Sequence, residues 1–153
     1  MLQLIVSGGQ TGVDRAALDA ALAAGLACGG WCPRGRRAED GAIPSRYPLR
    51  ETPGTGYPER TAWNVRDSDA TLVLTRGRPR GGTALTIGLA RRAGRPLLVV
   101  DLAVAAAAGD VSDWIGREGI RTLNVAGPRE SEAPGIHAAA TRFLGAVFAT
   151  SAH

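Results

Sequence analysis

Glycine and polar residues that could bind an anion stand directly after the first apolar run of the chain. Residues 7–15, SGGQTGVDR, follow the run Leu4-Ile5-Val6 and lead into a helical pattern that starts near Asp14. Glycines let a phosphate group approach the backbone, and a helix N-terminus offers unpaired N–H groups. The G-G-x-x-G spacing is not the Rossmann fingerprint, and the chain has no Lys for a P-loop. The pattern predicts either an anion cradle or a tight strand-to-helix turn without a ligand.

Two more turns of similar composition follow other apolar runs. Residues 76–83, RGRPRGGT, come after the run 70–75, and residues 126–131, AGPRES, come after the run 121–125. Because the carboxyl ends of parallel strands lie at one edge of a sheet, we expect the three turns to form one cleft. The hydroxyl and guanidinium groups that would line it, with backbone N–H groups, are those of Ser7, Thr11, Thr83, Ser131, Arg80 and Arg129.

Strand patterns that alternate with helix patterns must position these turns. The expected strands are 4–6, 26–31, 70–75, 97–100 and 121–125, and the expected helices are 14–24, 60–67, one from Thr83 to Gly94, 111–117 and 134–149. This order indicates the α/β class, with a parallel sheet of about five strands covered by helices on both faces. The first helix should face inward with Ala17, Leu18, Ala21 and Leu22, and the third with Leu85, Leu89 and Ala93.

Residues 33–59 have no hydrophobic period and contain five prolines and five arginines. A segment of this length without regular structure is usually functional or disordered. We therefore expect a segment that packs no core and acts either as a charged lid over the cleft or as a solvated loop. The whole chain, 1–153, is expected to be a single ligand-binding domain, with this segment as its candidate lid.

The charge of the chain is carried by arginine alone. All 18 basic residues are Arg, and the formal net charge is +4. Arginine suits anionic ligands because its planar fork binds phosphate and carboxylate, although a codon preference would give the same composition. A nucleic-acid partner is a minor alternative, since the arginines are scattered and aromatic residues make up only 5% of the chain.

The remaining composition excludes several other classes of protein. We expect a soluble, cytoplasmic protein because the first strand starts near Met1 without a leader and the longest apolar stretch, 97–108, is too short to span a bilayer. Cys28 and Cys32 are too few for a four-thiolate zinc site and predict buried free thiols. No metal-ligating residues are expected.

Five blocks of the sequence together resemble a known family. They are SGGQTGVDRAALD, PRGRRAEDGAIP, RTAWNVRDSDATLVL, GGTALT and LNVAGPRES, in this order. In these blocks the chain is similar to the molybdenum cofactor carrier protein family, a circularly permuted, YpsA-like branch of the SLOG superfamily. The resemblance covers most of the chain and implies a Rossmann-like fold, a homo-oligomer that would be a tetramer, and binding of molybdenum cofactor, a pterin with a phosphate group.

The resemblance also implies which residues bind this ligand. The implied cofactor-binding residues are Gly8, Gly9, Gln10, Thr11, Gly12 and Arg15 in the first turn, Gly81, Gly82 and Thr83 in the second, and Gly127, Arg129, Glu130 and Ser131 in the third. Asp14 is expected to cap the first helix. Glu39 and Asp40 could bond the ring of the pterin from the lid. A molybdoenzyme that receives the cofactor is an implied partner.

Relatives in the same superfamily suggest an alternative function. Some are phosphoribohydrolases, which release a base from a nucleoside monophosphate and use a glutamate three residues after the Thr of a G-T pair. Thr86 stands at that position here, so Glu39, Asp40 or Glu130 would have to supply the carboxylate. With two His and no Lys, the chain has few catalytic groups, which favours a binding or carrier protein. A nucleotide sensor and a nucleoside-monophosphate glycosidase stay open as alternatives.

Overall fold

The centre of the computed structural model, which describes residues 1–151, is a sheet of five parallel strands. Their order is β2, β1, β9, β7, β8. Their bounds are Leu4–Val6 (β1), Ala27–Gly29 (β2), Ala70–Thr75 (β7), Leu97–Asp101 (β8) and Thr122–Ala126 (β9). The predicted α/β class and the Rossmann-like sheet are confirmed. Strand β9, late in the chain, lies between β1 and β7, so the strand order changes direction there.

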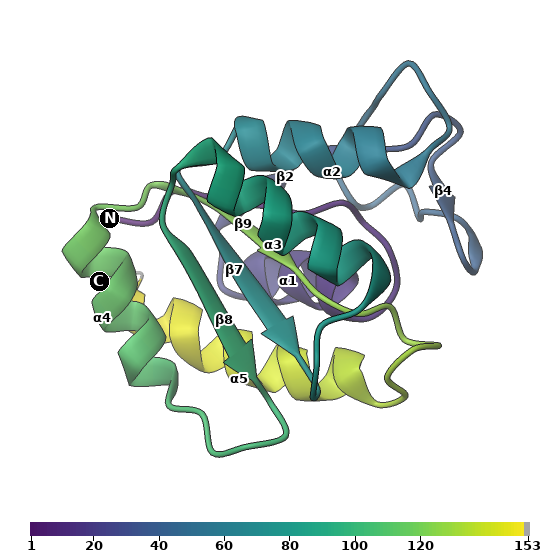
Figure 1. Ribbon diagram of the computed structural model, residues 1–153. Coiled ribbons are helices and arrows are strands. Elements are labelled where there is room, and N and C mark those ends of the chain that lie inside the picture. The colour runs from purple at the N-terminus through teal and green to yellow at the C-terminus, as the bar shows by residue number, and fades with distance from the viewer. Residues whose placement is uncertain (152–153) are drawn as a thin grey trace.

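Helices cover both faces of this sheet (Figure 1). Their bounds are Val13–Ala23 (α1), Tyr57–Arg66 (α2), Gly81–Ala93 (α3), Ala108–Glu118 (α4) and Ile136–Ser151 (α5). Helix α1 packs against α5, and α5 packs against α4, whereas α2 packs against α3. Figure 1 shows α3 in front of the strands and α1 and α5 behind them. The carboxyl ends of the strands, where the cleft is expected, therefore lie between two helical layers.

The main core lies between the sheet and the α1–α5 layer. Every residue of β7 is buried, and Ala17 and Ala21 of α1 are fully buried as predicted. Leu22 was predicted to be inward but is 46% exposed. The reason is length: the eleven residues of α1 span about 16 Å, whereas the three residues of β1 span about 10 Å, so the last helical turn extends beyond the strand.

The buried face of α3 also differs from the prediction. It consists of Thr83, Thr86, Ile87 and Ala90, whereas Leu85 and Leu89 are only partly buried and Ala93 is exposed. Leu85 instead borders the cavity described below. The helix ends as predicted, because Gly94 takes the left-handed C-cap conformation, with φ of 67°.

The predicted strand 26–31 is divided into two strands. Residues Trp31–Cys32 form β3, which pairs with β6 (Arg50–Glu51) and not with the main sheet. Gly30 separates β2 from β3 with φ of 127°, and a Cβ atom there would lie 2.4 Å from the Ser7 carbonyl oxygen. The close approach of the first turn thus ends β2 at Gly29.

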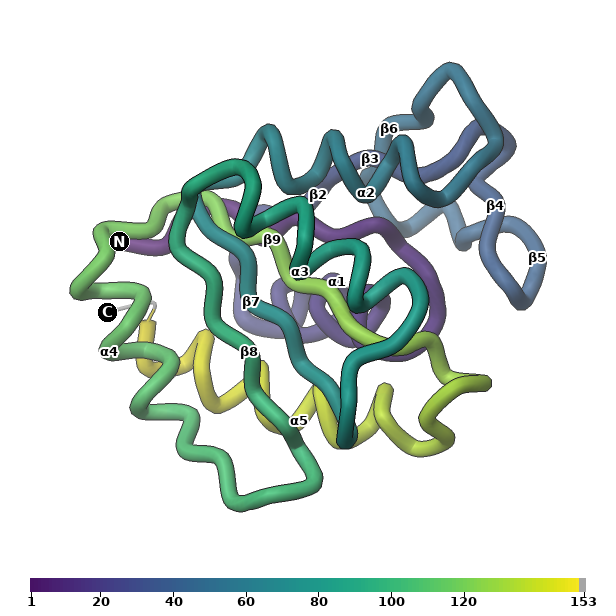
Figure 2. Tube along the Cα trace, in the orientation of Figure 1, coloured from purple at the N-terminus to yellow at the C-terminus, as the bar shows by residue number. Residues whose placement is uncertain are grey.

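The expectation that residues 33–59 pack no core is wrong. Ala38, Ile43 and Tyr47 are buried with Cys32 and Leu18 of α1 in a second apolar cluster. Two short strands, β4 (Arg37–Ala38) and β5 (Gly41–Ala42), form a hairpin in this segment, which projects beyond the main sheet in Figure 2. Hydrophobic periodicity missed this packing because Ala38 lies in a strand of two residues, and Ile43 and Tyr47 lie outside helices and strands.

Arg36 organises the interior of the same segment. Its guanidinium donates hydrogen bonds to the carbonyl oxygens of Ile43 (3.0 Å), Pro44 (2.8 Å) and Tyr47 (2.8 Å). The φ of Arg36 is 54°, and no other non-glycine residue of the described chain has a positive φ. One arginine side chain thereby satisfies carbonyl groups that would otherwise be paired in regular secondary structure.

Candidate functional site

A cavity of about 360 Å³ opens at the carboxyl ends of β1, β9 and β7. It lies between the end of β9 and the two helices α2 and α3. Its apolar wall includes Tyr57, Pro58, Leu85, Val125 and Ala126. Seven of the sequence-predicted site residues line it: Gly8, Gln10, Gly81, Gly82, Thr83, Gly127 and Arg129. The three turns meet at one sheet edge, as expected, but they contribute unequally.

The second turn presents open backbone to the cavity. A Cβ atom built on Gly81 or Gly82 would meet no other atom within 4 Å. The N-cap residue of α3, Arg80, makes no side-chain cap, and its carbonyl accepts hydrogen bonds from the N–H groups of Thr83 and Ala84. The N–H groups of Gly81 and Gly82 have no protein acceptor in the described chain. This helix start can therefore receive an anion directly.

The glycines of the first turn have a different role. A Cβ atom on Gly8 would lie 2.3 Å from Nη1 of Arg60, and one on Gly12 would lie 2.3 Å from the Pro128 carbonyl oxygen. Gly9 faces Leu49 at 2.5 Å. Protein atoms therefore occupy the space that these glycines provide. They allow segments of the chain to approach closely, so close approach of a ligand is not needed to explain them.

The polar side chains of the first turn bind other parts of the protein. The Gln10 amide oxygen accepts hydrogen bonds from the N–H groups of Thr11 (3.0 Å) and Glu39 (2.9 Å). The hydroxyl of Thr11 donates to the carboxylate of Glu39 and accepts a hydrogen bond from the N–H of Glu130. Gly9, Thr11, Gly12 and Arg15 do not line the cavity.

The third turn divides between the cavity and the protein. Gly127 and Arg129 line the cavity, and Nε of Arg129 lies 3.0 Å from a carboxylate oxygen of Glu132. Glu130 instead accepts hydrogen bonds from the N–H groups of Gly135 (2.7 Å) and His137 (3.0 Å) at the start of α5. These bonds hold the pKa of Glu130 below its usual value. Glu130 and Ser131 lie outside the cavity lining.

The two lid carboxylates are also bound to protein groups. Hydrogen bonds from Ser131 and Thr11 keep the pKa of Glu39 below its usual value, although burial opposes this shift. Asp40 pairs with Arg15 through two contacts of 2.5 and 3.1 Å, and this hydrogen bonding lowers its pKa. Neither carboxylate lines the cavity. They fasten the segment 33–59 to the first and third turns.

Three charged residues of the cavity lining were absent from the sequence-predicted set, Asp14, Arg60 and Glu132, and the first two are buried. Arg60 of α2 is 8% exposed, and its Nη1 donates a hydrogen bond of 2.6 Å to the Gly8 carbonyl oxygen. Asp14 is 6% exposed, with Oδ2 3.8 Å from Nη1 of Arg60. Burial, opposed by Arg60, raises the pKa of Asp14 to about 6. Asp14 also accepts a hydrogen bond from the N–H of Gln10, but the N-cap residue of α1 is Gly12.

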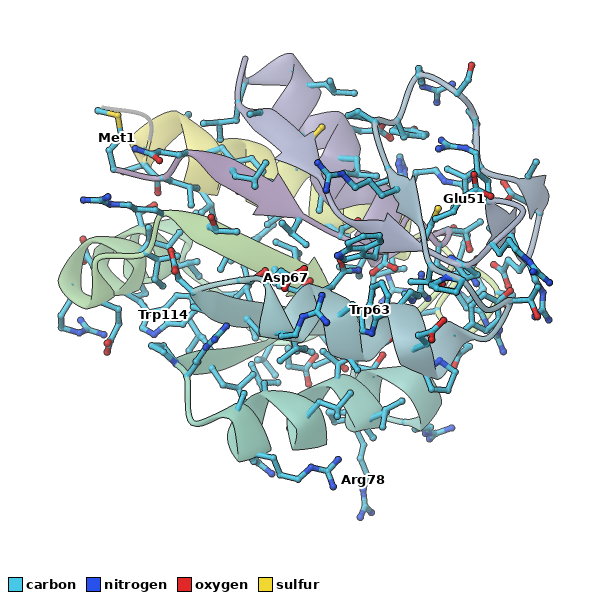
Figure 3. The ribbon with its side chains drawn as sticks, turned by 90° about the horizontal axis from the view of Figure 1, so that it is seen from above. Met1, Glu51, Trp63, Asp67, Arg78 and Trp114 are labelled. Carbon is cyan, nitrogen blue, oxygen red and sulfur yellow. The ribbon has the colours of Figure 1, made fainter. Side chains whose placement is uncertain are left out.

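Contacts with Trp31 also fix helix α2. The side-chain amide of Asn64 bonds both the N–H (2.7 Å) and the carbonyl (3.0 Å) of Trp31. Trp31 also packs edge-on against Trp63, and its indole N–H donates to Asp67. Trp63 and Asp67 lie close together in Figure 3. The i, i+4 spacing of Arg60 and Asn64 is the sequence signal that could have placed Arg60 on the inner face of α2.

The fold and the cavity together define a class of protein: a Rossmann-like domain with a ligand cavity where the strand order changes direction. The chain belongs to the circularly permuted YpsA SLOG family, whose model matches residues 5–148. A crystal structure of a protein from Syntrophus aciditrophicus SB, named "Putative molybdenum carrier protein", is 41% identical. The match covers 95% of this chain and 94% of that chain, with a TM-score of 0.90.

No match was found among curated proteins. Within residues 1–151, no helix combines the length and the apolar character that crossing a membrane requires.

Proposed function

We propose that the cavity binds molybdenum cofactor and that the protein carries or stores it. The observation that carries this proposal is the open backbone at Gly81 and Gly82, which faces the same cavity as the buried guanidinium of Arg60. A helix start and a buried arginine are suited to a phosphate group. The name of the similar protein from Syntrophus aciditrophicus SB supports a molybdenum-containing ligand.

The cavity residues fit the two ends of a phosphate-bearing pterin. Gly81, Gly82 and Arg60 would hold the phosphate through N–H groups, with the hydroxyl of Thr83 beside them, because nothing fills the space above the glycines. Tyr57 and the apolar wall would cover the planar ring. A volume of about 360 Å³ lies within the usual range for small-molecule sites, roughly 300–1,000 Å³. The metal-bearing dithiolene chemistry would be supplied by the cofactor itself.

A nucleoside-monophosphate glycosidase is a second candidate, supported by one observation. The buried carboxylate of Asp14 lines the cavity and has its pKa raised to about 6, which is typical of acid–base groups. The carboxylates considered from the sequence, Glu39, Asp40 and Glu130, do not line it, and the Thr86 hydroxyl donates to the Gly82 carbonyl. A glycosidase would therefore depend on Asp14. A sensor of a nucleotide-derived ligand would use the same cavity without this chemistry.

Anaerobic equilibrium dialysis against molybdenum cofactor tests the carrier proposal. We expect retention by the unchanged protein, at least tenfold weaker retention by Arg60→Gln, and no change in Asp113→Asn, which alters an exposed carboxylate on α4. Equal retention by Arg60→Gln would contradict the proposed site. Incubation with AMP provides the second arm: base release that Asp14→Asn abolishes would establish the glycosidase instead.

We also propose that the protein forms a homo-oligomer, a tetramer by its resemblance, and delivers the cofactor to a molybdoenzyme. Strand β8 is an edge strand of the main sheet, and its Val99 is 38% exposed. An edge strand has unpaired backbone N–H and C=O groups with which a second chain can pair. Light scattering after size-exclusion chromatography measures the assembly directly, and a mass near 15.8 kDa, that of one chain, would contradict it.

A further inference from the structure

Asp14 and Arg60 form a buried pair of opposite charges in the cavity wall. The two side chains are each 9% exposed, and Nη1 of Arg60 lies 3.8 Å from Oδ2 of Asp14. Both side chains border the space that the proposed anion would enter. Nη1 of Arg60 is also bonded to the Gly8 carbonyl, and Nε is bonded to the Thr61 hydroxyl. Nη2 has no protein acceptor in the described chain, so it can donate to a ligand.

Few other cations face Asp14. From its own helix, Arg15 acts on it, but that guanidinium is bonded to both carboxylate oxygens of Asp40. From the third turn, Arg129 is paired with Glu132 and faces Glu39. Strand β9 contributes the neutral side chain of Asn124. Arg60 is therefore the main counter-charge for Asp14 in this part of the cavity.

A ligand dianion in the same cavity would place three negative charges around one guanidinium. Like charges within a few ångströms disfavour the ionised form of a carboxyl group, more strongly where water is excluded. We propose that the cavity binds a tetrahedral dianion together with one proton, which Asp14 takes up. This inference rests on the proposed function, because it concerns the same anion site. The bound anion and the proton are then released together as the pH rises.

In the free protein, burial already raises the pKa of Asp14 to about 6. At pH 7.5 most molecules therefore hold Asp14 ionised, and a further rise of its pKa on anion binding would protonate it. The coupled proton makes the affinity for a dianion fall by up to tenfold for each pH unit above the pKa of free Asp14. A carrier with this property binds its ligand more tightly in a mildly acidic medium.

Sulfate is the probe that isolates the proton of Asp14, because sulfate has no titration of its own near neutral pH. We would titrate the protein with sulfate by calorimetry at pH 7.5, in buffers of different ionisation enthalpy, and obtain the number of protons taken up. The expected uptake is close to one proton for the unchanged protein and for Asp113→Asn, and close to zero for Asp14→Asn. The affinity of Asp14→Asn for sulfate should also be independent of pH between 6 and 8.

Two further arms separate the sources of the dianion. Sulfate and molybdate represent a free oxyanion, and AMP represents a phosphate ester. If the site requires an ester, AMP binds and the free oxyanions do not. The proton taken up by Asp14 is then the number of protons taken up by the unchanged protein on binding AMP minus the number taken up by Asp14→Asn. A carboxyl-carbon NMR titration of Asp14, with and without the anion, measures its pKa directly and should give a higher value with the anion bound.

The outcomes distinguish the inference from the proposed function. Anion binding without proton uptake, or uptake that persists in Asp14→Asn, would overturn the proton coupling and leave the anion site intact. Retention of molybdenum cofactor with the same pKa of Asp14 in both states would do the same. Failure of sulfate, molybdate, AMP and the cofactor to bind would overturn both.

Discussion

The pKa of Asp14 departs strongly from that of an exposed carboxyl group, because Asp14 is buried. An Asp carboxyl with an ordinary pKa of 3.8 and a folded-state pKa of about 6 is more easily protonated in the folded protein. Between these two values the folded state holds the proton that the unfolded state has lost, so stability falls as the pH rises through this range. Above about pH 6 the full difference applies, equivalent to about 3 kcal/mol.

We therefore expect Asp14→Asn to stabilise the protein at pH 7.5, by up to about 3 kcal/mol, because the raised pKa means that burial costs the carboxylate more than its attraction to Arg60 offsets, and the neutral amide carries no such cost. The advantage should nearly vanish near pH 3.5, where the carboxyl is protonated in the folded state and mostly protonated in the unfolded state. Thermal unfolding of the two proteins from pH 3.5 to 8 measures it. The quantity to compare is the stability of Asp14→Asn minus that of the unchanged protein. A smaller difference at pH 7.5 than at pH 4 would contradict the burial of this charge.

Glu130 shows how a residue of a candidate binding turn can serve the fold instead. Its carboxylate accepts the N–H groups of Gly135 and His137 at the start of α5, so we expect Glu130→Gln to cost about 1 kcal/mol of stability at pH 7. Because the folded-state pKa is lowered, this contribution is present above the ordinary pKa of 4.5 and is lost as the pH falls below it. Sulfate affinity should not change. Weaker sulfate binding with unaltered stability would contradict this structural role and would indicate that Glu130 belongs to the binding site.

At the scale of elements, the first and second glycine turns should respond oppositely to an added methyl group. Gly12 has φ of 77°, and its Cβ would meet the Pro128 carbonyl, so Gly12→Ala should lose on the order of 3 kcal/mol of stability. Gly82→Ala meets no atom and lies inside α3, so its stability should be equal or higher by about 0.5–1 kcal/mol. Its sulfate affinity should fall severalfold. Denaturant unfolding and calorimetry measure both quantities.

The same two turns show what the sequence predicts and what it does not. Periodicity and turn residues predicted the five main strands to within a few residues, and the C-cap at Gly94. Glycine spacing located the turns, but it could not tell whether a ligand or another segment fills the space above each glycine. That distinction depends on Arg60 and Pro128, which are distant in sequence. The core contribution of Ile43 and Tyr47 was hidden because these residues lie outside helices and strands, where no periodicity marks the buried side.

Over the whole molecule, the permuted strand order brings the site together. Strand β9 lies between β1 and β7, although the three strands come from the end, the start and the middle of the chain. The turns that follow these strands therefore meet at one edge of the sheet. The sequence predicted this shared edge from the parallel sheet alone. Arg60, on α2, completes the cavity only because Asn64 and Trp63 dock that helix on Trp31. The i, i+4 spacing of Arg60 and Asn64 indicates that they share a helix face, but the surface on which that face docks has no local signal in the sequence.

The most direct test of the account is to locate the anion within the cavity. We would record backbone and guanidinium NMR spectra of the protein during titration with sulfate. We expect the N–H signals of Gly81, Gly82 and Thr83 and the guanidinium signals of Arg60 to shift first, while those of Gly9 and Gly12 stay constant. Shifts confined to residues 8–12, with Gly82 and Arg60 unaffected, would contradict it.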